Sequence, residues 1–346
     1  MGKTAPDQVQ NAVLIGAGMV AGTHAAALRD AARVKLYGVW SRDAAKAHAL
    51  ASPQGARIFA RVQDIADDPQ VDFAILLTPP NARADLIAPL LAAKKPILME
   101  KPIARDLSEA RAVVDQCAAA GVALGVVFQH RMRAASKAAA ALVASGDLGA
   151  LGLVTITVPW WRDQSYYDEP GRGTYARDGG GVLISQAIHT IDLALWLSGP
   201  VVSVQAMTAT TRFHAMQAED FATAGLRFAN GAVGSLVAST ASYPGGAETI
   251  TLQFERATLH LEAGVLRVSH RDGRVETHGE MAGTGGGADP MAFTHAWHQA
   301  VIEDFADAIA QGRPPAITGR AGLAAHALID AITQSARTGQ TTEVSP

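Results

Sequence analysis

Short apolar runs of strand length alternate with longer helical stretches over about the first 130 residues. The expected strands are residues 11–15, 34–40, 71–77, 96–99 and 122–128. The expected helices are residues 22–29, 44–51, 82–94 and 108–119. Alternation of this kind is typical of a parallel, doubly wound sheet. The amino-terminal part is therefore predicted to be an α/β domain.

The pattern changes after Arg131. A helix at 137–145 precedes segments rich in Thr and Val with alternating polarity, at residues 154–160, 201–212, 221–241 and 248–262. This alternation predicts a large, mostly antiparallel open sheet with one face on helices. A flexible glycine-rich loop is expected at 283–287, and two closing helices at 295–311 and 319–337. We therefore divide the chain into an α/β domain, 1–131, and an α+β domain, 132–346.

Composition and charge narrow the class of protein. At 346 residues the chain is long enough for two domains with a large core. Lys and Arg number 29 against 32 Asp and Glu, so there is no broad basic field for nucleic acid. The single Cys117 excludes an intrachain disulfide and a cysteine metal cluster, and suits a reducing compartment. No apolar run approaches the roughly 20 residues that span a bilayer, and the polar residues 1–10 lack a signal-peptide core. We expect a cytoplasmic protein.

A glycine pattern follows the first predicted strand. Gly16, Gly18 and Ala21 form G-x-G-x-x-A between a strand and a helix, with Met19 and Val20 inside the turn. Gly16 allows the tight turn, Gly18 lets the backbone approach a pyrophosphate, and Ala21 lets the helix pack on the strand. The helix N-terminus then offers N–H groups to the phosphates. These features predict a Rossmann dinucleotide site; the alternative is an ordinary tight turn.

The end of the second predicted strand bears on the choice of cofactor. NAD sites place an acidic residue here for the ribose, whereas NADP sites place an arginine for the 2′-phosphate. This chain has Ser41 and Arg42, and an arginine can bind phosphate through two hydrogen bonds. Asp43 is expected to cap the helix 44–51. We predict NADP rather than NAD; the alternative is that Ser41 and Arg42 form a solvated turn.

Glu100, Lys101 and Pro102 follow directly after the apolar run 96–99. A lysine there stands at the carboxyl end of a buried strand, where open α/β sheets hold their ligands. Thr78 to Asn81 ends the neighbouring strand and can cover the cofactor. The sequence thus places a titratable amine beside a predicted nicotinamide nucleotide.

A second chemical motif lies on an apolar helix after Gly179 to Gly181, which are expected to be a flexible approach. Ser185, His189 and Asp192 follow at spacings that put them on one helix face. Alcohol oxidation needs a base for the hydroxyl proton, and histidine titrates near neutrality. A desolvated lysine beside it could share this role. The alternative for His189 is a hydrogen-bonded core histidine.

These motifs, with the tail 315–339, resemble the glucose–fructose oxidoreductase / inositol dehydrogenase / rhizopine catabolism (Gfo/Idh/MocA) family nearly end to end. The resemblance implies hydride transfer between a nicotinamide and a sugar, polyol or related secondary alcohol. It implies that Lys101 contacts the nicotinamide ribose and the reacting oxygen, and that Lys101–Pro102 is a candidate cis peptide. It also implies an open sheet that packs against another subunit, in a homodimer or homotetramer.

The glycine turn, the strand ends and the family pattern together give a set of site residues. Expected to bind the cofactor are Gly16, Gly18, Met19, Val20, Ser41, Arg42, Thr78, Pro79, Asn81, Glu100, Lys101 and Gln129. Expected to bind the substrate are Lys101, Arg162, Tyr167, Arg172, Ser185, His189 and Asp192. Lys101 and His189 are predicted to be the catalytic acid/base pair.

The chain departs from the family pattern at two positions. Ser185 stands where many members have an aspartate, and a hydroxyl cannot raise the basicity of His189 as a carboxylate would. Ser185 is therefore expected to position the substrate, and its surroundings look like a subgroup that includes sugar-nucleotide uronate 3-dehydrogenases. Arg83 stands where members often have histidine, and we expect it on the cofactor loop.

Aromatic residues and arginines gather between residues 160 and 174. Aromatic faces stack on sugars and arginines bind carboxylate or phosphate, so Arg162, Tyr167 and Arg172 suggest a wall for an anionic substrate. The alternative is a structured loop at a subunit interface. His298 is expected to pack rather than reach the site. No histidines show ligand spacing, so no metal site is predicted.

Three functions from different classes are compatible with these observations. The first is an NADP- or NAD-dependent sugar or polyol oxidoreductase. The second is a redox-neutral, NAD-dependent glycosidase on the same fold, and the third is a non-catalytic cofactor-sensing regulator. Lys101 and His189 argue against the regulator, and Arg42 argues against the glycosidase.

Overall fold

The computed structural model describes residues 9–283, 285–287 and 291–345, which form two compact units. The first unit contains the described part of Met1–Ala104 together with Ser108–Gln129 and His295–Gly322. The second contains Arg105–Leu107 and the described parts of His130–Thr294 and Leu323–Pro346. Residues 1–8, on which part of the expectation of no signal peptide rests, and Thr284 of the predicted glycine-rich loop lie outside the described residues.

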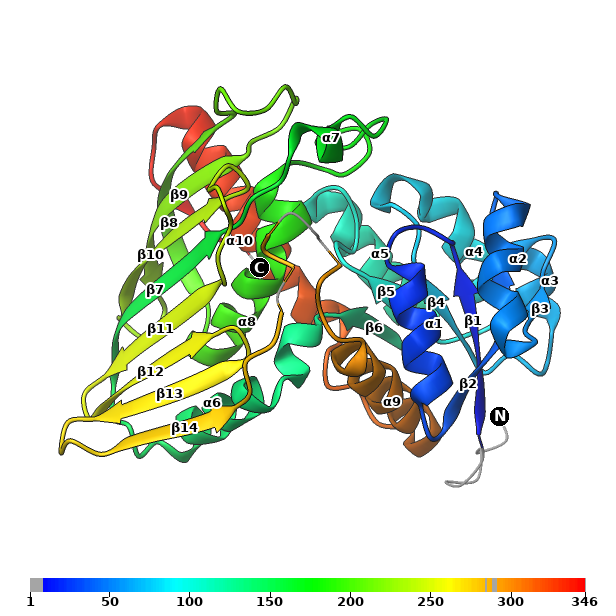
Figure 1. The fold of residues 1–346 in the computed structure, drawn as a ribbon, viewed down its shortest axis with the longest axis horizontal. Helices are drawn as coiled ribbons and strands as arrows, with labels where there is room; N and C mark the ends of the chain where they lie inside the picture. Colours follow the sequence, from blue (N-terminus) through cyan, green and yellow to red (C-terminus); the bar gives the residue numbers. More distant parts are fainter. Residues whose placement is uncertain (1–8, 284, 288–290, 346) are drawn as a thin grey trace. The chain divides into compact units, whose positions relative to one another are not determined.

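The first unit is built on a six-stranded sheet whose strand pairs are all parallel (Figure 1). Its order is β3 (Arg57–Ile58), β2 (Val34–Trp40), β1 (Gln10–Ile15), β4 (Phe73–Leu76), β5 (Ile97–Glu100) and β6 (Leu124–Val127). Every residue of β4, β5 and β6 is buried, as in sheets covered on both faces. This is the Rossmann order, so the predicted doubly wound sheet is confirmed. The short β3 is absent from the predicted pattern because both its residues are exposed.

Helix α9 is the main difference from the expected domain division, since it joins the first unit from late in the chain. The other helices of this unit are α1 (Ala21–Asp30), α2 (Ala44–Ala51), α3 (Val62–Asp67), α4 (Ala84–Ala92) and α5 (Leu107–Ala119). Helix α9 (Ala296–Gln311) packs beside α1 (Figure 1). Its Phe305 ring meets Phe73 at 5.4 Å and fills the space that a Cβ at Gly125 would take. Apolar packing on the sheet thus holds this helix.

The second unit contains a nine-stranded sheet in which only β7 and β10, among the described strands, pair in parallel. Its order is β14 (Val275–Gly279), β13 (Val265–His270), β12 (Ala257–Glu262), β11 (Thr249–Phe254), β7 (Leu151–Pro159), β10 (Val233–Ser239), β9 (Phe221–Phe228), β8 (Val201–Ala209) and β15 (Thr342–Glu343). The predicted mostly antiparallel sheet is confirmed. The sheet extends by β13 and β14 beyond the predicted β segments.

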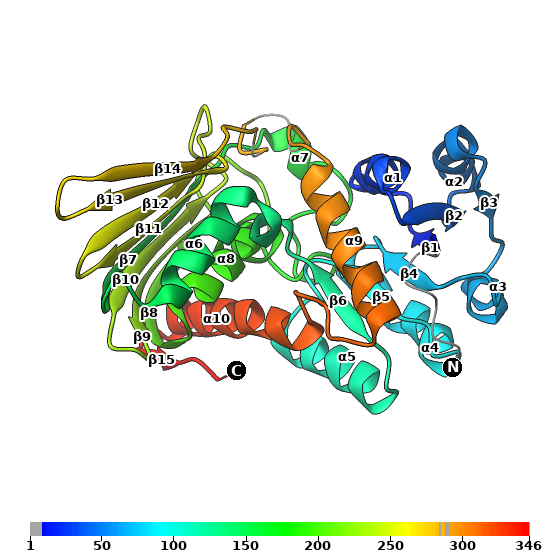
Figure 2. The ribbon, with the colours of Figure 1, turned by 90° about the horizontal axis from the view of Figure 1, so that it is seen from below.

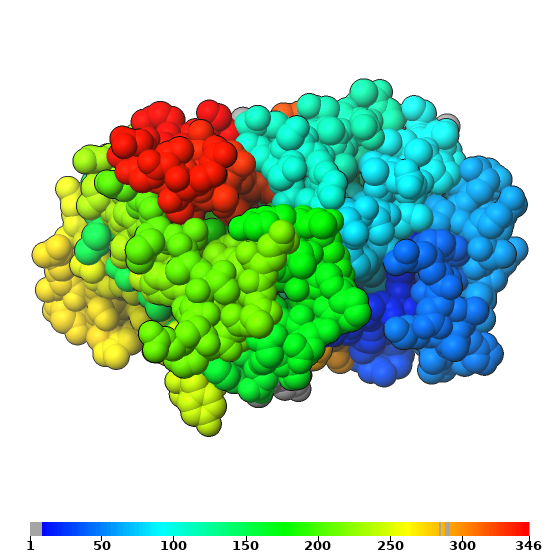
Figure 3. Space-filling view, turned by 90° about the horizontal axis from the view of Figure 1, so that it is seen from above, coloured from blue at the N-terminus to red at the C-terminus, as the bar shows by residue number. Residues whose placement is uncertain are grey.

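Helices cover one face of this sheet (Figure 2). They are α6 (Ala134–Ser145), α8 (Ile188–Ser198) and most of α10 (Gly319–Thr338). On the other face, no helix is found among the described residues, and the outward side chains of Leu153, Val233 and Val237 are exposed. Strand β15 pairs with β8 at one edge of the sheet. Residues of the carboxyl-terminal part, in red, form part of the surface in Figure 3. This unit therefore has a helix-covered face and an open face.

Candidate active site

The predicted site residues fall in both units, and the cofactor turn lies in the first. Gly16 follows β1 with a φ of +115°, and a Cβ on it would lie 3.1 Å from the backbone nitrogen of Thr78. Only glycine meets both conditions without strain. The space above Gly18 is open, because no atom lies within 4 Å of a Cβ built there. Helix α1 begins at Ala21, and no side chain caps it. The N–H groups of its first turn are therefore not used by a capping side chain.

The end of β2 has the arrangement expected from its sequence. Asp43 caps α2 by accepting hydrogen bonds from the backbone N–H groups of Ala45 and Lys46, both at 3.1 Å. Ser41 accepts the backbone N–H of Asp43. Arg42 is exposed, and its guanidinium has no hydrogen bond or ion pair with the described residues. Its charge therefore remains available to a ligand.

Arg83 joins the two loops that follow β4 and β5. Its guanidinium is 2% exposed and donates to the carbonyl of Thr78 at 2.8 and 3.0 Å. It also donates to the carbonyls of Glu100, Pro102 and Ile103. Burial lowers the pKa of Arg83 to about 10, so the group keeps its charge at neutral pH. Arg83 thus links the loops at the carboxyl ends of β4 and β5, the edge of the sheet where the cofactor is predicted to bind and which we call the cofactor edge. The sequence gives no sign of these buried contacts.

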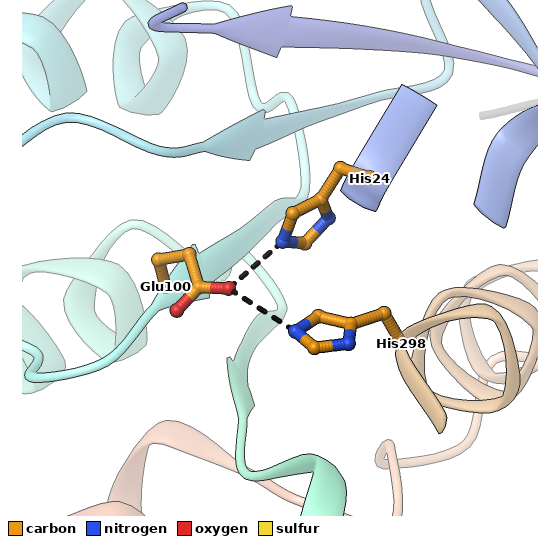
Figure 4. A group of neighbouring side chains, drawn as sticks. All are labelled: His24, Glu100 and His298. Carbon is orange, nitrogen blue, oxygen red and sulfur yellow. Dashed lines mark hydrogen bonds and ion pairs between the residues drawn. The ribbon is translucent and has the colours of Figure 1, made fainter. Parts of the chain in front are cut away.

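The carboxylate of Glu100, a residue predicted to bind the cofactor, points to α1 and α9 (Figure 4). Oε1 accepts the His24 Nε2–H at 2.8 Å and lies 3.9 Å from Nε2 of His298. Oε2 accepts the backbone N–H of Lys101 at 3.1 Å. Burial favours the neutral acid, but the hydrogen bond and field of His24, with His298 and Lys101, lower the pKa of Glu100 to about 2. The carboxylate is therefore a buried anion beneath Lys101, and the Lys101–Pro102 peptide is cis, as the resemblance implied.

The His24, Glu100 and His298 side chains also meet the spacing of a metal site. Their ligand atoms lie within 4.8 Å of one another, and all three residues are buried. The chain spacing gives no sign of this cluster, since the residues come from α1, β5 and α9. His298 packs in the core, as expected, with its ring edge toward His24 at 5.1 Å. The absence of a metal site stays a prediction.

Replacing His298 with glutamine is expected to make stability less sensitive to acid. Burial, with a smaller effect of His24, lowers the pKa of His298 to about 3, whereas an unfolded histidine titrates near 6.5. Below about pH 6.5 the unfolded chain therefore binds one more proton, and stability falls by about 1.4 kcal/mol per pH unit. Urea unfolding between pH 6 and pH 4 should show a shallower slope in His298→Gln. Equal slopes would contradict a neutral His298.

In the second unit, the glycines before the helix that carries His189 are required by close packing and are not a flexible approach. A Cβ on Gly179, whose φ is +87°, would lie 2.1 Å from the carbonyl oxygen of Arg105. A Cβ on Gly181 would lie 1.7 Å from the carbonyl oxygen of Glu219. The Glu219 carboxylate accepts the N–H groups of Gly181 and Leu183, each at 3.1 Å. The expectation of flexibility was wrong because these contacts fix the start of the helix.

The helix carrying Ser185 and His189 is not a continuous α-helix. Residues Leu183–Ala187 form a π-helical turn, η4, and α8 begins at Ile188. A π turn uses i→i+5 hydrogen bonds in place of the i→i+4 bonds of an α-helix. The regular α-helix expected here is therefore interrupted at Ser185, and the shared face of Ser185, His189 and Asp192 stays a prediction. Ser185 is half-buried and His189 is 6% exposed.

Asp192 was predicted to bind substrate, but the structure pairs it with Arg131. The guanidinium donates to both carboxylate oxygens, at 2.7 and 2.6 Å, and Asp192 is 1% exposed. Burial raises the pKa of Asp192 to about 6 although Arg131 opposes it. Arg131 also lies over the Trp196 ring, at 5.4 Å. The carboxylate is thus paired within the unit, and its contact with a substrate stays a prediction.

His189 has a neighbour that sequence reasoning missed. The rings of His130 and His189 stack with centroids 4.9 Å apart and planes 26° from parallel. Nδ1 of His130 lies 4.0 Å from Oε1 of Glu248, which accepts a 2.7 Å hydrogen bond from Arg133. His130 comes just after Gln129, in a short helical turn after β6. A histidine there gives no periodic signal, since its partner is on another element.

Two members of the predicted substrate wall have structural partners. Arg162 is 2% exposed and donates to the carbonyls of Gly285 and Gly287, both at 2.6 Å. The hydroxyl of Tyr167 forms a 2.6 Å hydrogen bond with Thr240, and burial raises its pKa. These polar groups link the loops of this unit, and the substrate role of both residues stays a prediction. Sequence reasoning identified the residue types but not these partners.

Arg172 remains the candidate for an anionic ligand. It is half-buried, stacks over the Tyr166 ring at 4.3 Å and donates to the Tyr166 hydroxyl at 2.9 Å. Glu169 forms an ion pair with it. The amide of Gln186, next to Ser185, donates to the same hydroxyl at 3.2 Å. Tyr166 therefore connects the arginine to the π-helical turn.

Two models of known protein families match this chain. The model of an oxidoreductase family with an NAD-binding Rossmann fold matches residues 10–128, and that of the GFO/IDH/MocA C-terminal domain matches residues 136–260. The chain belongs to the GFO/IDH/MocA oxidoreductase family. Like other GFO/IDH/MocA members, it is an NAD-binding oxidoreductase, as the resemblance implied.

Relatives within the GFO/IDH/MocA family match this chain nearly end to end. Inositol 2-dehydrogenase of Rhizobium meliloti (strain 1021) is 30% identical, over 93% of this chain and 95% of the relative. D-apiose dehydrogenase of Rhizobium rhizogenes is 26% identical, over 96% of each chain. The WlbA dehydrogenase from Bordetella pertussis, solved with NADH and UDP-GlcNAcA, is 28% identical, with a TM-score of 0.82 over 98% of this chain and 99% of that one. No helix in the described part of the chain is long and apolar enough to cross a membrane.

Proposed function

We propose that this enzyme transfers hydride between a nicotinamide nucleotide and a secondary alcohol of a sugar, sugar acid, sugar nucleotide or polyol, with Lys101 and His189 as acid and base. When the alcohol is oxidised, hydride goes to the nicotinamide and the hydroxyl proton to a side chain. When the carbonyl is reduced, both steps run in reverse. The cofactor supplies the hydride chemistry, and the protein supplies binding, orientation and proton transfer.

One observation carries the cofactor part of this proposal. The Gly16 turn, the Thr78 loop and Lys101 lie at the carboxyl ends of the neighbouring strands β1, β4 and β5. Ligands of open α/β sheets bind at these ends, next to the switch point. The uncapped start of α1, which follows β1, suits the pyrophosphate. Lys101 follows β5, which is the second strand from β1 in the sheet. Gln129, just after β6, is at the same edge.

Arg42 supports NADP as the preferred cofactor, since its exposed charge follows the strand end where the ribose is recognised. Replacing Arg42 with alanine is expected to weaken NADPH binding about ten-fold or more, the loss of a charge-assisted contact, and to leave NADH binding nearly unchanged. Calorimetric titration of both cofactors measures this difference. Equal losses for both cofactors would rule out the phosphate contact, and Lys46→Ala, on the exposed face of α2, is the matched control.

The substrate class rests on Arg172, on the names of two relatives, inositol 2-dehydrogenase and D-apiose dehydrogenase, and on the UDP-GlcNAcA in the WlbA structure. A screen of polyols, sugars, uronates and sugar nucleotides, with NADP⁺ and NAD⁺, tests the proposed function. Reduced nicotinamide formed with at least one of these classes supports it, and formed with none overturns it. Loss of activity in Arg172→Ala on anionic substrates alone would support the anionic class.

We also propose that the open face of the nine-stranded sheet joins two copies of the chain. Exposed Leu153 and Val233 are register partners on this face, and exposed Val237 lies four residues further along β10 on the same face, opposite Thr157. Exposed apolar patches rimmed by polar side chains mark interaction surfaces. Light scattering should report a dimer or tetramer, and Val237→Lys should shift it toward the monomer.

A further inference from the structure

We propose that Glu100 is the positioning residue for Lys101: its buried carboxylate holds the backbone N–H of Lys101 and supplies the counter-charge for the ammonium, with His24 and His298 as its polar partners. This inference rests on the proposed acid/base role of Lys101. It assigns a function to a buried cluster that lies beneath the cofactor edge and that the hydride transfer itself does not use.

The first support is geometric. Each carboxylate oxygen of Glu100 has its own hydrogen-bond partner. Oε2 accepts the backbone N–H of Lys101 at 3.1 Å, and Oε1 accepts the His24 Nε2–H at 2.8 Å. The Glu100 carbonyl accepts a 2.6 Å hydrogen bond from Arg83. Glu100 is therefore fixed through its side chain and its main chain. The backbone of Lys101, from which its side chain extends, is therefore also held in place.

The second support is the charge around the carboxylate. The groups that face Glu100 are His24 on α1, His298 on α9, Arg83 before α4 and Lys101 itself, with His295 near His298. At the pH where an amine titrates, an ordinary imidazole is neutral. The buried carboxylate is then balanced by Arg83 and Lys101. Removing its charge should make the ammonium of Lys101 easier to deprotonate.

The same charges argue against a metal ion in this cluster. A divalent cation held by His24, Glu100 and His298 would lie beside the positive groups Arg83 and Lys101. The 2.8 Å separation of Nε2 of His24 from Oε1 of Glu100 is that of a hydrogen bond. His24 and His298 therefore act as polar partners that let a carboxylate stay ionised in the core.

Two substitutions separate charge from shape. Glu100→Gln keeps the volume and an acceptor oxygen but removes the charge, whereas Glu100→Asp keeps the charge and shortens the reach. The readout is the pH dependence of Lys101 labelling by acetic anhydride, followed by mass spectrometry of its peptide, which needs no enzyme activity. The proposal expects the midpoint to fall by about one pH unit or more in Glu100→Gln and to stay near the wild-type value in Glu100→Asp. Asp85→Asn, which removes an exposed charge from α4, should leave it unmoved.

The outcomes separate this proposal from the proposed function. If labelling shifts in Glu100→Gln while Lys101→Ala keeps full turnover, the positioning holds and the acid/base role of Lys101 fails. If the midpoint is the same in wild type and Glu100→Gln, or if it moves equally in Glu100→Asp, the positioning proposal is overturned. One equivalent of zinc in the dialysed protein, lost in His298→Gln, also overturns it, because Glu100 would then be a metal ligand. Circular dichroism would show whether Glu100→Gln folds. If it does not, Glu100→Asp still tests the proposal, because this variant retains the charge. A shift of one pH unit in its labelling midpoint would contradict the proposal.

Discussion

Turnover should fall at least a thousand-fold when Lys101 is replaced by alanine, while cofactor affinity changes by less than ten-fold. The lysine follows the buried end of β5, and its amide is held by Glu100, so removal of its side chain leaves the backbone of the cofactor edge in place. General acid–base groups contribute about 100- to 10,000-fold to rate, and Lys101 is also proposed to orient the reacting oxygen. The measurement is the steady-state rate of nicotinamide reduction, combined with calorimetric titration of the cofactor.

Lys35→Ala provides the control, because this lysine lies exposed on β2 and its change removes the same charge from the same unit. It should retain wild-type turnover. If Lys101→Ala keeps more than a tenth of the wild-type rate, Lys101 does not carry the proton transfer. If it loses cofactor binding to the same extent as turnover, its role is in binding rather than in chemistry.

The second large effect is on stability, in the Arg131–Asp192 pair. Replacing Arg131 with methionine leaves a carboxylate that is 1% exposed without its two hydrogen bonds. Breaking a buried pair in this way costs about 3–5 kcal/mol. The midpoint of urea unfolding, followed by tryptophan fluorescence, should fall accordingly. Because the pKa of Asp192 is already raised to about 6 by burial, the lone carboxyl should take up a proton near neutral pH.

The double variant Arg131→Met with Asp192→Leu tests the cause of this loss. With no unpaired charge left in the core, much of the lost stability should return. A double variant as unstable as Arg131→Met alone would show that the packing of Arg131 on Trp196, rather than the unpaired charge, accounts for the effect. Arg274 is the matched control, because its side chain is 65% exposed where it pairs with Asp272, so Arg274→Met should change stability little.

The fold of the first unit could be predicted from sequence because its signals are local. The Gly16 turn and the Asp43 cap each depend on neighbouring residues, and the buried strands appear as short continuous apolar runs. The same local signals fail for α9, whose place is decided by Phe305 meeting Phe73 and Gly125 on distant strands. They also miss β13 and β14, where exposed positions dilute the apolar alternation.

The candidate site could be predicted only as far as residue type and place along the chain. Asp192, Arg162 and Tyr167 have the right chemistry for a substrate, but each has a buried partner that the spacing does not reveal. Asp192 and Arg131 are separated by 61 residues, and Arg162 and Gly285 by 123. The hydrogen bonds of Glu219 to the N–H groups of Gly181 and Leu183, at the start of the π-helical turn, likewise join residues far apart in the sequence. Such long-range pairings are what a single sequence does not show.

The hydrogen bonds of Arg83 have a consequence for the binding of a dinucleotide. One guanidinium holds carbonyls from the loop after β4 and from the loop after β5, so neither loop can open without breaking bonds to the other. The two loops therefore present a single preformed rim, and little conformational entropy is left to lose when a dinucleotide binds. A charged residue buried between these loops would thus favour binding through the backbone that it holds.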